Sequence, residues 1–219
     1  MADRRFGLGI VSVAFGHETS QAEAARRAAD LGFDHIDVSL DRPLPRGPLA
    51  LPVVDRLTST ARTGCTCRAP RDCTWDEAVA MLRRAPGIRV EPTPASILSN
   101  AAAVRAMCEE VPGLAITLDT GWAVYHGEDP LDLIDLAGHV QLRQARRGVA
   151  QVHPDDGGDV DFGAVLDGLV RTGYRGALSV EYFDLPDLGL AFGDPLGCCV
   201  ALAAQVRPLL GARGPARRP

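Results

Sequence analysis

Hydrophobic and polar positions follow two rhythms that alternate along the chain. Short β-rich runs are followed by stretches in which apolar residues recur at helical spacing. The pattern predicts strands at residues 6–15, 35–40, 88–91, 114–119, 139–143 and 177–181. It predicts helices at residues 19–31, 74–86, 99–110, 130–137, 162–172 and 194–210. Regular strand-helix alternation favours an α/β protein with a parallel sheet and helices on the outside.

The rhythm is interrupted over residues 41–86. Pro43, Pro45, Pro48 and Pro52 break any long element there, and only the segments 50–54 and 64–67 look strand-like. Two strand-helix units must share this stretch, which is short for them. We therefore expect one helix in this region to be degenerate or missing.

Four predicted strands end in a side chain with an oxygen ligand. Glu91, Asp119, Gln141 and Glu181 close the runs IRVE, AITLD, HVQ and ALSVE, at separations of 28, 22 and 40 residues. In an open sheet four neighbouring strand ends would spread over roughly 14 Å, at about 4.8 Å per strand, too far for one ion. In a barrel they converge on a common axis. The pattern predicts a (β/α)₈ TIM barrel, abbreviated over residues 41–86, with a divalent-metal site at one end.

Size and charge restrict the function further. A chain of 219 residues with 46% hydrophobic residues fits one domain, which we place at residues 1–210, followed by a flexible tail at 211–219. A net charge of −5 without a large basic cluster argues against nucleic acid as a partner. No apolar run is long enough for a membrane, and we expect a soluble, cytoplasmic protein that binds a small molecule.

One residue type is absent. The 23 basic residues are all arginine, and arginine cannot lose its proton to act as an amine nucleophile. The absence excludes Schiff-base chemistry on a lysine. The six cysteines are expected to be reduced, because a chain of this size needs no disulfides.

Several segments carry a family resemblance. They are GLGI at 7–10, AADLGFDHIDV at 28–38, VEP at 90–92, LDTGW at 118–122, GHVQLR at 138–143 and GGDVDFGAVLDGLVRTGYRGALSVEYF at 157–183. Together they resemble the xylose-isomerase-like TIM-barrel superfamily of sugar isomerases and epimerases, over nearly the whole chain except the proline-rich part. The HVQ motif, with glutamine in place of a more frequent metal-binding histidine, is most similar to the hydroxypyruvate isomerase branch.

The resemblance implies roles for the four strand-end residues. Glu91, Asp119, Gln141 and Glu181 would bind one divalent cation, and Glu91 and Glu181 would also act as catalytic residues that move protons. The implied function is a metal-dependent isomerase or epimerase of a small sugar, keto-sugar or hydroxy-ketone that works through a metal-bound enediolate. Oxygen ligands favour Mn²⁺ or Mg²⁺ over Zn²⁺. The resemblance also implies a homodimer or homotetramer.

The chain departs from the family pattern near the substrate. Trp122 stands where the family usually has a histidine three residues after the aspartate. We expect Trp122, Arg143, Arg147 and His17 to contact the substrate, with the arginines holding a carboxylate or phosphate. His139, two residues before Gln141, is expected to orient a ligand or fill the core.

Two other functions remain open. The same site could eliminate instead of returning a proton, which would make the protein a dehydratase or lyase acting on a polyol or keto-sugar. Alternatively, the barrel could be catalytically degenerate and serve as a binding or accessory subunit, as the Trp122 substitution and the shortened middle would allow.

Overall fold

The computed structural model describes residues 6–186 and 190–211. The strands are β1 (Leu8–Val11), β2 (Ile36–Ser39), β3 (Val53–Thr58), β4 (Thr66–Arg68), β5 (Arg89–Glu91), β6 (Ala115–Asp119), β7 (Ala137–Leu142) and β8 (Leu178–Val180). The α-helices are α1 (Gln21–Asp30), α2 (Trp75–Arg83), α3 (Ala101–Glu110), α4 (Thr120–His126), α5 (Phe162–Arg171) and α6 (Pro195–Gly211). Three 3₁₀ helices are η1 (Ser12–Phe15), η2 (Pro130–Leu136) and η3 (Pro154–Asp156).

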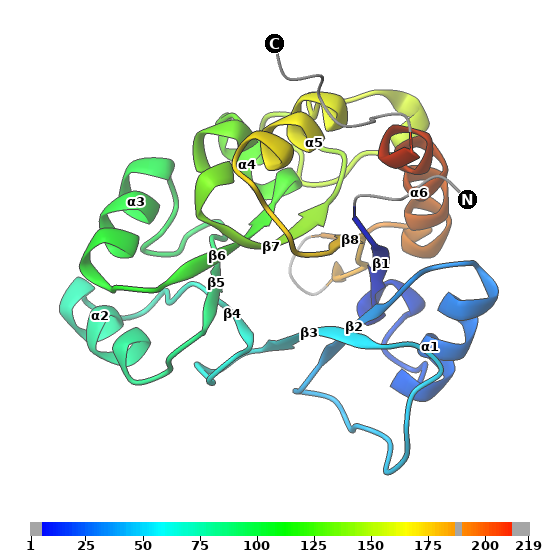
Figure 1. The fold of residues 1–219 in the computed structure, drawn as a ribbon, viewed down its shortest axis with the longest axis horizontal. Coiled ribbons are helices and arrows are strands. Elements are labelled where there is room, and N and C mark those ends of the chain that lie inside the picture. Colours follow the sequence, from blue (N-terminus) through cyan, green and yellow to red (C-terminus); the bar gives the residue numbers. More distant parts are fainter. Residues whose placement is uncertain (1–5, 187–189, 212–219) are drawn as a thin grey trace.

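The strands form a closed barrel in chain order, from β1 to β8, and β8 pairs with β1. Every neighbouring pair is parallel, and the helices lie around the outside (Figure 1). The predicted (β/α)₈ barrel is confirmed. Because all strands run in the same direction, their C-terminal ends open on one face of the barrel.

The side chains of each strand alternate between the inside of the barrel and the layer between the barrel and the helices. Successive side chains of a strand point to opposite faces, so one set packs outward beneath the helices and the other fills the barrel. The outward set is fully buried and apolar, and includes Ile10, Ile36, Val90, Ile116, Leu118, Val140, Leu142 and Leu178. The inward set is largely polar, and includes Asp37, Asp55, Thr66, Thr117, His139 and Ser179.

The barrel is abbreviated more than the sequence predicted. Both the connection from β2 to β3, residues 40–52, and that from β3 to β4, residues 59–65, lack a helix, and both lie within the described chain. The expectation of a single missing helix was therefore wrong. Figure 1 shows β3 without a helix outside it, between α1 and α2. As a result Val54, on the outward side of β3, is 40% exposed.

The N-termini of three helices agree with the sequence pattern. The hydroxyl of Ser20 accepts a hydrogen bond from the Glu23 backbone N–H at the start of α1. Thr74 and Glu77 form a complete capping box at the start of α2. Asn100 accepts from the Ala103 backbone N–H at the start of α3. These side chains satisfy backbone donors that have no partner within the helix.

One helix was not predicted and another has a different form. α4 begins directly after Asp119, whose carboxylate caps it, so strand and helix meet without a linker. The helix expected at 130–137 is the 3₁₀ helix η2, which begins at Pro130 after a side-chain cap from Asp129. Because Gly121 and Trp122 follow the β-rich run almost directly, the sequence pattern did not indicate that α4 begins there.

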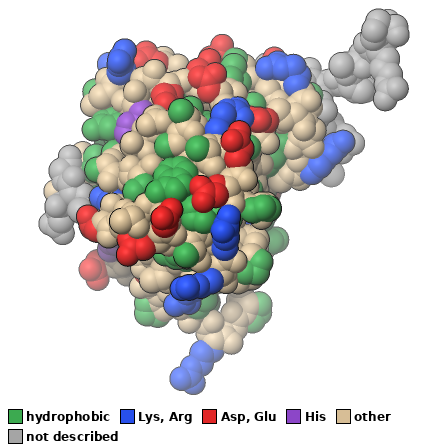
Figure 2. Space-filling model, turned by 90° about the vertical axis from the view of Figure 1, so that its left-hand side faces the viewer, with side chains coloured by type: hydrophobic (Ala, Val, Ile, Leu, Met, Phe, Trp, Pro, Cys, Tyr) green, Lys and Arg blue, Asp and Glu red, His purple; other side chains and the backbone are tan. Residues whose placement is uncertain are grey.

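The last helix of the described chain is α6. α6 includes Gly211, the first residue of the predicted tail, and residues 212–219 lie outside the described residues. Figure 2 shows the side of the molecule that carries α2 and α3, where acidic and basic side chains are interspersed. None of the helices in the described part of the chain combines the length and apolar character needed to cross a membrane.

Candidate metal and active site

The four predicted ligands occupy one level at the C-terminal end of the barrel. Glu91 ends β5, Asp119 ends β6, Gln141 lies in β7, and Glu181 directly follows β8. Asp119 is in register with Gln141, and Gln141 with Ser179 of β8. One carboxylate oxygen from each of Glu91, Asp119 and Glu181 lies within 4.8 Å of the others, and all three side chains are buried. Barrel closure therefore brings these carboxylates together.

Gln141 is in register with Asp119, and its buried side-chain amide makes no hydrogen bond among the described residues. The residue has no solvent exposure. Neither its amide oxygen nor its amide nitrogen has a hydrogen-bond partner among the described residues, and the same is true of Oε2 of Glu181. Buried polar atoms are nearly always paired, since an unpaired one costs about 1–3 kcal/mol. Three carboxylates beside an unpaired amide oxygen fit a hard divalent cation such as Mg²⁺ or Mn²⁺.

Burial and neighbouring negative charge raise the pKa values of Glu91 and Glu181. Burial, followed by the charge of Asp119, raises the pKa of Glu91 to about 7, against the opposing effects of Arg68, Arg143 and the Trp122 N–H. Burial, followed by the charges of Glu91 and Asp119, raises the pKa of Glu181 well above its ordinary value. The Glu91 carboxyl group is therefore poised to exchange protons near neutral pH.

Asp119 has a structural role as well as a candidate ligand role. Its Oδ1 accepts hydrogen bonds from the backbone N–H of Gly121 at 2.7 Å and of Trp122 at 3.2 Å, which caps α4. The cap fixes the first turn of α4 and with it the ring of Trp122. The indole Nε1 of Trp122 donates to Oε1 of Glu91 at 3.0 Å. The residue that replaces the family histidine thus orients a candidate catalytic carboxylate.

Arg143 lies beside Asp119 and is fully buried. Its Nη2 donates to Oδ2 of Asp119. Its guanidinium lies between the rings of Trp122 and Phe183, 4.4 and 4.5 Å from their centroids, a cation–π arrangement. Gly121 makes room for it, because a Cβ at that position would lie 2.4 Å from Nε of Arg143. Nε and Nη1 of Arg143 have no hydrogen-bond partner among the described residues.

A cavity of about 370 Å³ opens above the carboxylates. Glu91 and Glu181 line it, and Phe183 forms part of its wall. His17 lines it too and is exposed, as a residue at the rim would be. Of the residues expected to contact the substrate, His17 thus lines the cavity, whereas Trp122 and Arg143 contact two of its lining residues, Glu91 and Phe183.

Arg147 is not brought to this cavity. It is exposed and lines a different surface hollow together with Glu128, Asp129 and Asp159. Its side chain packs against Gly127, where an added Cβ would lie only 2.8 Å from the Nε of Arg147. The turn after β7 directs this side chain outward, over α4, and away from the carboxylates.

Two arginines at the cavity were not identified from the sequence. Arg68 and Arg42 both line it. The signal for Arg68 was available, because it ends β4 in register with Glu91, in the same way that the proposed ligands end their strands. The strand-like segment recognised in the sequence, residues 64–67, ends one residue before Arg68.

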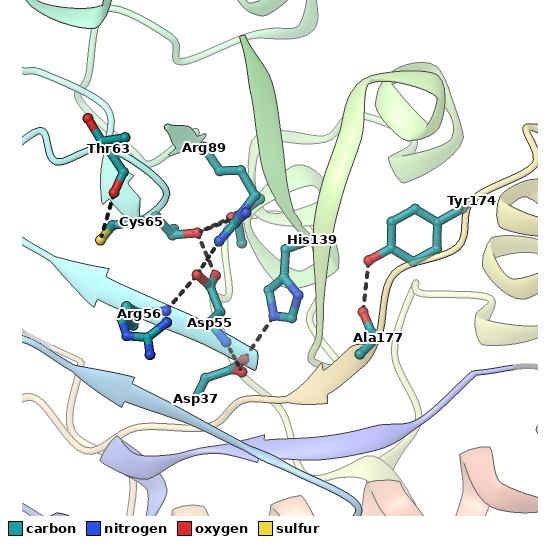
Figure 3. Close-up of polar contacts among 11 residues, drawn as sticks. Asp37, Asp55, Arg56, Thr63, Cys65, Arg89, His139, Tyr174 and Ala177 are labelled. Carbon is teal, nitrogen blue, oxygen red and sulfur yellow. Dashed lines mark hydrogen bonds and ion pairs between the residues drawn. The ribbon is translucent and has the colours of Figure 1, made fainter. Parts of the chain in front are cut away.

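A buried polar layer supports the site from below (Figure 3). His139 Nε2 lies 2.8 Å from Oδ2 of Asp37, and Asp55 accepts hydrogen bonds from Thr66 and Arg89. Burial acts to lower the pKa of His139, but the charge and hydrogen bond of Asp37 outweigh it, so the pKa is raised. His139 therefore fills the barrel as an ionic partner of Asp37.

His35 completes this layer on the side of β1 and β8. Its Nε2 lies 3.0 Å from Oγ of Ser179, the residue in register with Gln141. The ring occupies the space left by Gly9, where a Cβ would lie 2.2 Å from Nε2 of His35. Close packing of this kind keeps the strands that carry the candidate ligands at fixed positions.

Comparison with known proteins agrees with this architecture. The xylose isomerase-like TIM barrel family model matches residues 74–195. No curated protein is detectably similar in sequence to the chain.

Solved structures share the fold over nearly the whole chain. An L-ribulose 3-epimerase superimposes with a TM-score of 0.69 at 16% identity, covering 94% of this chain and 95% of its own. A xylose isomerase-like TIM barrel protein from Mycobacterium smegmatis, solved with magnesium, gives 0.71 at 12% identity, covering 94% and 97%. A probable 3-DHS dehydratase from Bacillus anthracis gives 0.63 at 13% identity, covering 92% and 98%. At these identities the similarity establishes the fold.

Proposed function

Because the chain belongs to the xylose isomerase-like TIM barrel family, we propose that it is a divalent-metal-dependent isomerase or epimerase of a small sugar, keto-sugar or hydroxy-ketone. The observation that carries the proposal is the cluster of three buried carboxylates, with the unpaired amide of Gln141 on the strand position paired with Asp119. A structural role alone would leave this amide with a hydrogen-bond partner. The similarity to a sugar epimerase supports the same class of reaction.

Glu91, Asp119, Gln141 and Glu181 would hold one Mn²⁺ or Mg²⁺. When bound, this ion would supply Lewis-acid catalysis, in which it withdraws electron density from the substrate carbonyl. The similar Mycobacterium smegmatis protein was solved with magnesium, which supports a cation of this kind. Arg143 offsets part of the negative charge of the cluster through Asp119.

Glu91 and Glu181 would carry out the proton transfers. They end β5 and follow β8, with β6 and β7 between them, and both line the cavity. One carboxylate removes the proton from the carbon beside the carbonyl, and the C–H electron pair forms the double bond of an enediolate. The other carboxyl group returns a proton to carbon. The Trp122 N–H holds Glu91 in a fixed orientation throughout.

Replacement of the second carboxylate tests this function. Glu181→Gln removes a proton carrier but keeps the size of the side chain, so we expect turnover to fall by about 10²–10⁴-fold with an unchanged circular dichroism spectrum. Glu109→Gln, an exposed position on α3, is the matched control and should retain full activity.

The assay is exchange of the substrate C–H with deuterated solvent, measured by NMR for dihydroxyacetone and for simple ketoses in the presence of Mn²⁺. Exchange without net conversion would still demonstrate the proton-transfer step. An empty site at saturating Mn²⁺, shown by metal analysis, would refute the proposal and favour a degenerate barrel with a binding role.

A dehydratase is the second candidate, favoured by the similarity to a probable 3-DHS dehydratase. The two carboxyl groups would then divide the work differently. One would remove the proton, and the other, in its protonated form, would donate to a leaving hydroxyl group. Loss of water from a β-hydroxy ketone, detected by ultraviolet absorbance of the enone, would distinguish this reaction from isomerisation.

A further inference from the structure

We propose that Arg68 selects substrates with an anionic group, so that the site acts on hydroxy-ketones that carry a carboxylate or a phosphate. This inference rests on the proposed function and specifies its substrate class. Arg68 is the last residue of β4 and is in register with Glu91 of β5. Residues in register on neighbouring strands point to the same face of the sheet, so Arg68 and Glu91 both face the mouth of the barrel.

The side chain of Arg68 is available for a ligand. It lines the 370 Å³ cavity together with Glu91 and Glu181, and it is exposed whereas both glutamates are buried. Within the described chain no hydrogen bond or ion pair engages its guanidinium. Its charge nevertheless reaches the site, because it lowers the pKa of both glutamates against the effect of burial.

The other arginines near the cavity are already engaged. Nη2 of Arg42 donates to backbone carbonyls before α1, including that of His17 at 2.9 Å. Arg42 therefore ties the proline-rich loop to the loop after η1. Arg143 is fully buried, does not line the cavity, is paired with Asp119 and lies between two aromatic rings. Neither guanidinium can turn into the cavity without losing these contacts.

Charge balance leaves Arg68 without a counterion. The three clustered carboxylates carry three negative charges when ionised, and a divalent cation with the guanidinium of Arg143 would neutralise them. At the rim, Asp41 and Arg42 offset each other, and the Asp41 carboxylate also accepts a hydrogen bond from the Ser59 backbone N–H at 2.7 Å. A neutral sugar would leave Arg68 uncompensated, whereas a substrate with one anionic group would pair with it.

The walls of the cavity favour such a pair. Val13, Leu57, Phe183 and Leu185 line it alongside the charged residues. Apolar walls exclude water and lower the local dielectric constant, which strengthens the attraction between a guanidinium and an anion. A guanidinium also matches the two oxygens of a carboxylate or phosphate with parallel hydrogen bonds.

The test compares three hydroxy-ketones that differ in one group. Dihydroxyacetone is neutral, hydroxypyruvate has a carboxylate in place of one hydroxymethyl group, and dihydroxyacetone phosphate has a phosphate ester. Binding to the Mn²⁺-loaded protein is measured by titration calorimetry for the wild type, Arg68→Gln and Arg71→Gln. Arg71, an exposed residue that does not line the cavity, controls for the loss of one positive charge near Arg68.

We expect at least one anionic probe to bind the wild type and Arg71→Gln about tenfold or more tightly than dihydroxyacetone does. Arg68→Gln should lose this preference. The tighter of the two anionic probes identifies the carboxylate or the phosphate as the group recognised. Equal binding of all three probes to the wild type, or an undiminished preference in Arg68→Gln, would overturn the proposal.

Solvent exchange separates this inference from the proposed function. If the wild type exchanges the C–H protons of dihydroxyacetone but shows no preference for anions, the inference about Arg68 fails and the proposed function stands. If the anionic preference depends on Arg68 but none of the probes exchanges protons, the proposed function fails and Arg68 remains an anion-binding residue.

Discussion

The buried ion pair between Asp119 and Arg143 should be a major determinant of the stability of the metal-free protein. Both side chains are inaccessible to solvent. Asp119→Asn keeps an oxygen that can accept from the Gly121 and Trp122 N–H groups, so α4 retains its cap. The substitution removes the carboxylate that compensates Arg143. The experiment therefore isolates the ion pair from the cap.

The magnitude follows from the surroundings of the pair. Removal of one partner from a buried ion pair typically costs about 3–5 kcal/mol. Asp119 also repels Glu91 and Glu181, and loss of that repulsion offsets part of the cost. We therefore expect Asp119→Asn to lower the free energy of unfolding by about 3 kcal/mol. Asp119→Ala should cost about 1 kcal/mol more, because it also removes the cap.

Urea unfolding in the presence of EDTA measures these changes. Arg143→Met in the Asp119→Asn background removes the stranded charge, so the double variant should be more stable than Asp119→Asn by about 1–2 kcal/mol. Asp72→Asn, an exposed position, is the control and should change stability by less than about 0.5 kcal/mol. A wild-type stability for Asp119→Asn, or a double variant in which the two costs simply add, would contradict the assigned geometry.

Two further predictions concern the metal. Gln141→Leu removes a buried amide that has no partner among the described residues, so stability in EDTA should stay constant or rise by about 1 kcal/mol, whereas Mn²⁺ affinity should fall at least about tenfold. Unchanged Mn²⁺ affinity would exclude this residue as a ligand. The carboxyl group of Glu91, with a pKa of about 7 in the metal-free protein, must lose its proton to bind a cation. Glu181, whose pKa is also raised, must ionise as well. Mn²⁺ affinity measured by calorimetry should therefore fall at least about tenfold from pH 8 to pH 6 with release of protons, and a flat pH profile would refute this assignment.

The shortened middle of the barrel is the region that the local sequence pattern predicted least well. The prolines at 43–52 correctly indicated that long elements are absent there, but the strand-like segment 50–54 overlaps only the start of β3, which runs through Val53–Thr58. Parallel pairing with β2 and β4 supplies the hydrogen bonds that stabilise this strand. These hydrogen bonds join separate segments of the chain, so the pattern within residues 53–58 does not reveal them.

The candidate ligands could be read from the chain alone because two local properties coincide in them. Each lies at the end of an apolar, β-rich run, and each has an oxygen ligand that would be costly to bury unpaired. Strand periodicity then determines the face on which Glu91, Asp119 and Gln141 lie, and a parallel sheet places the strand ends together.

The positions of the arginines were decided only by the tertiary structure. Arg143 and Arg147 are four residues apart and both were expected to bind an anion, yet one is fully buried beside Asp119 and the other lines a different surface hollow. Arg68 was not identified as a candidate, and it lines the cavity. An arginine side chain is long and flexible, so its charge is placed by the groups that packing brings around it. A carboxylate at a strand end has a short reach, and the strand itself therefore determines its position.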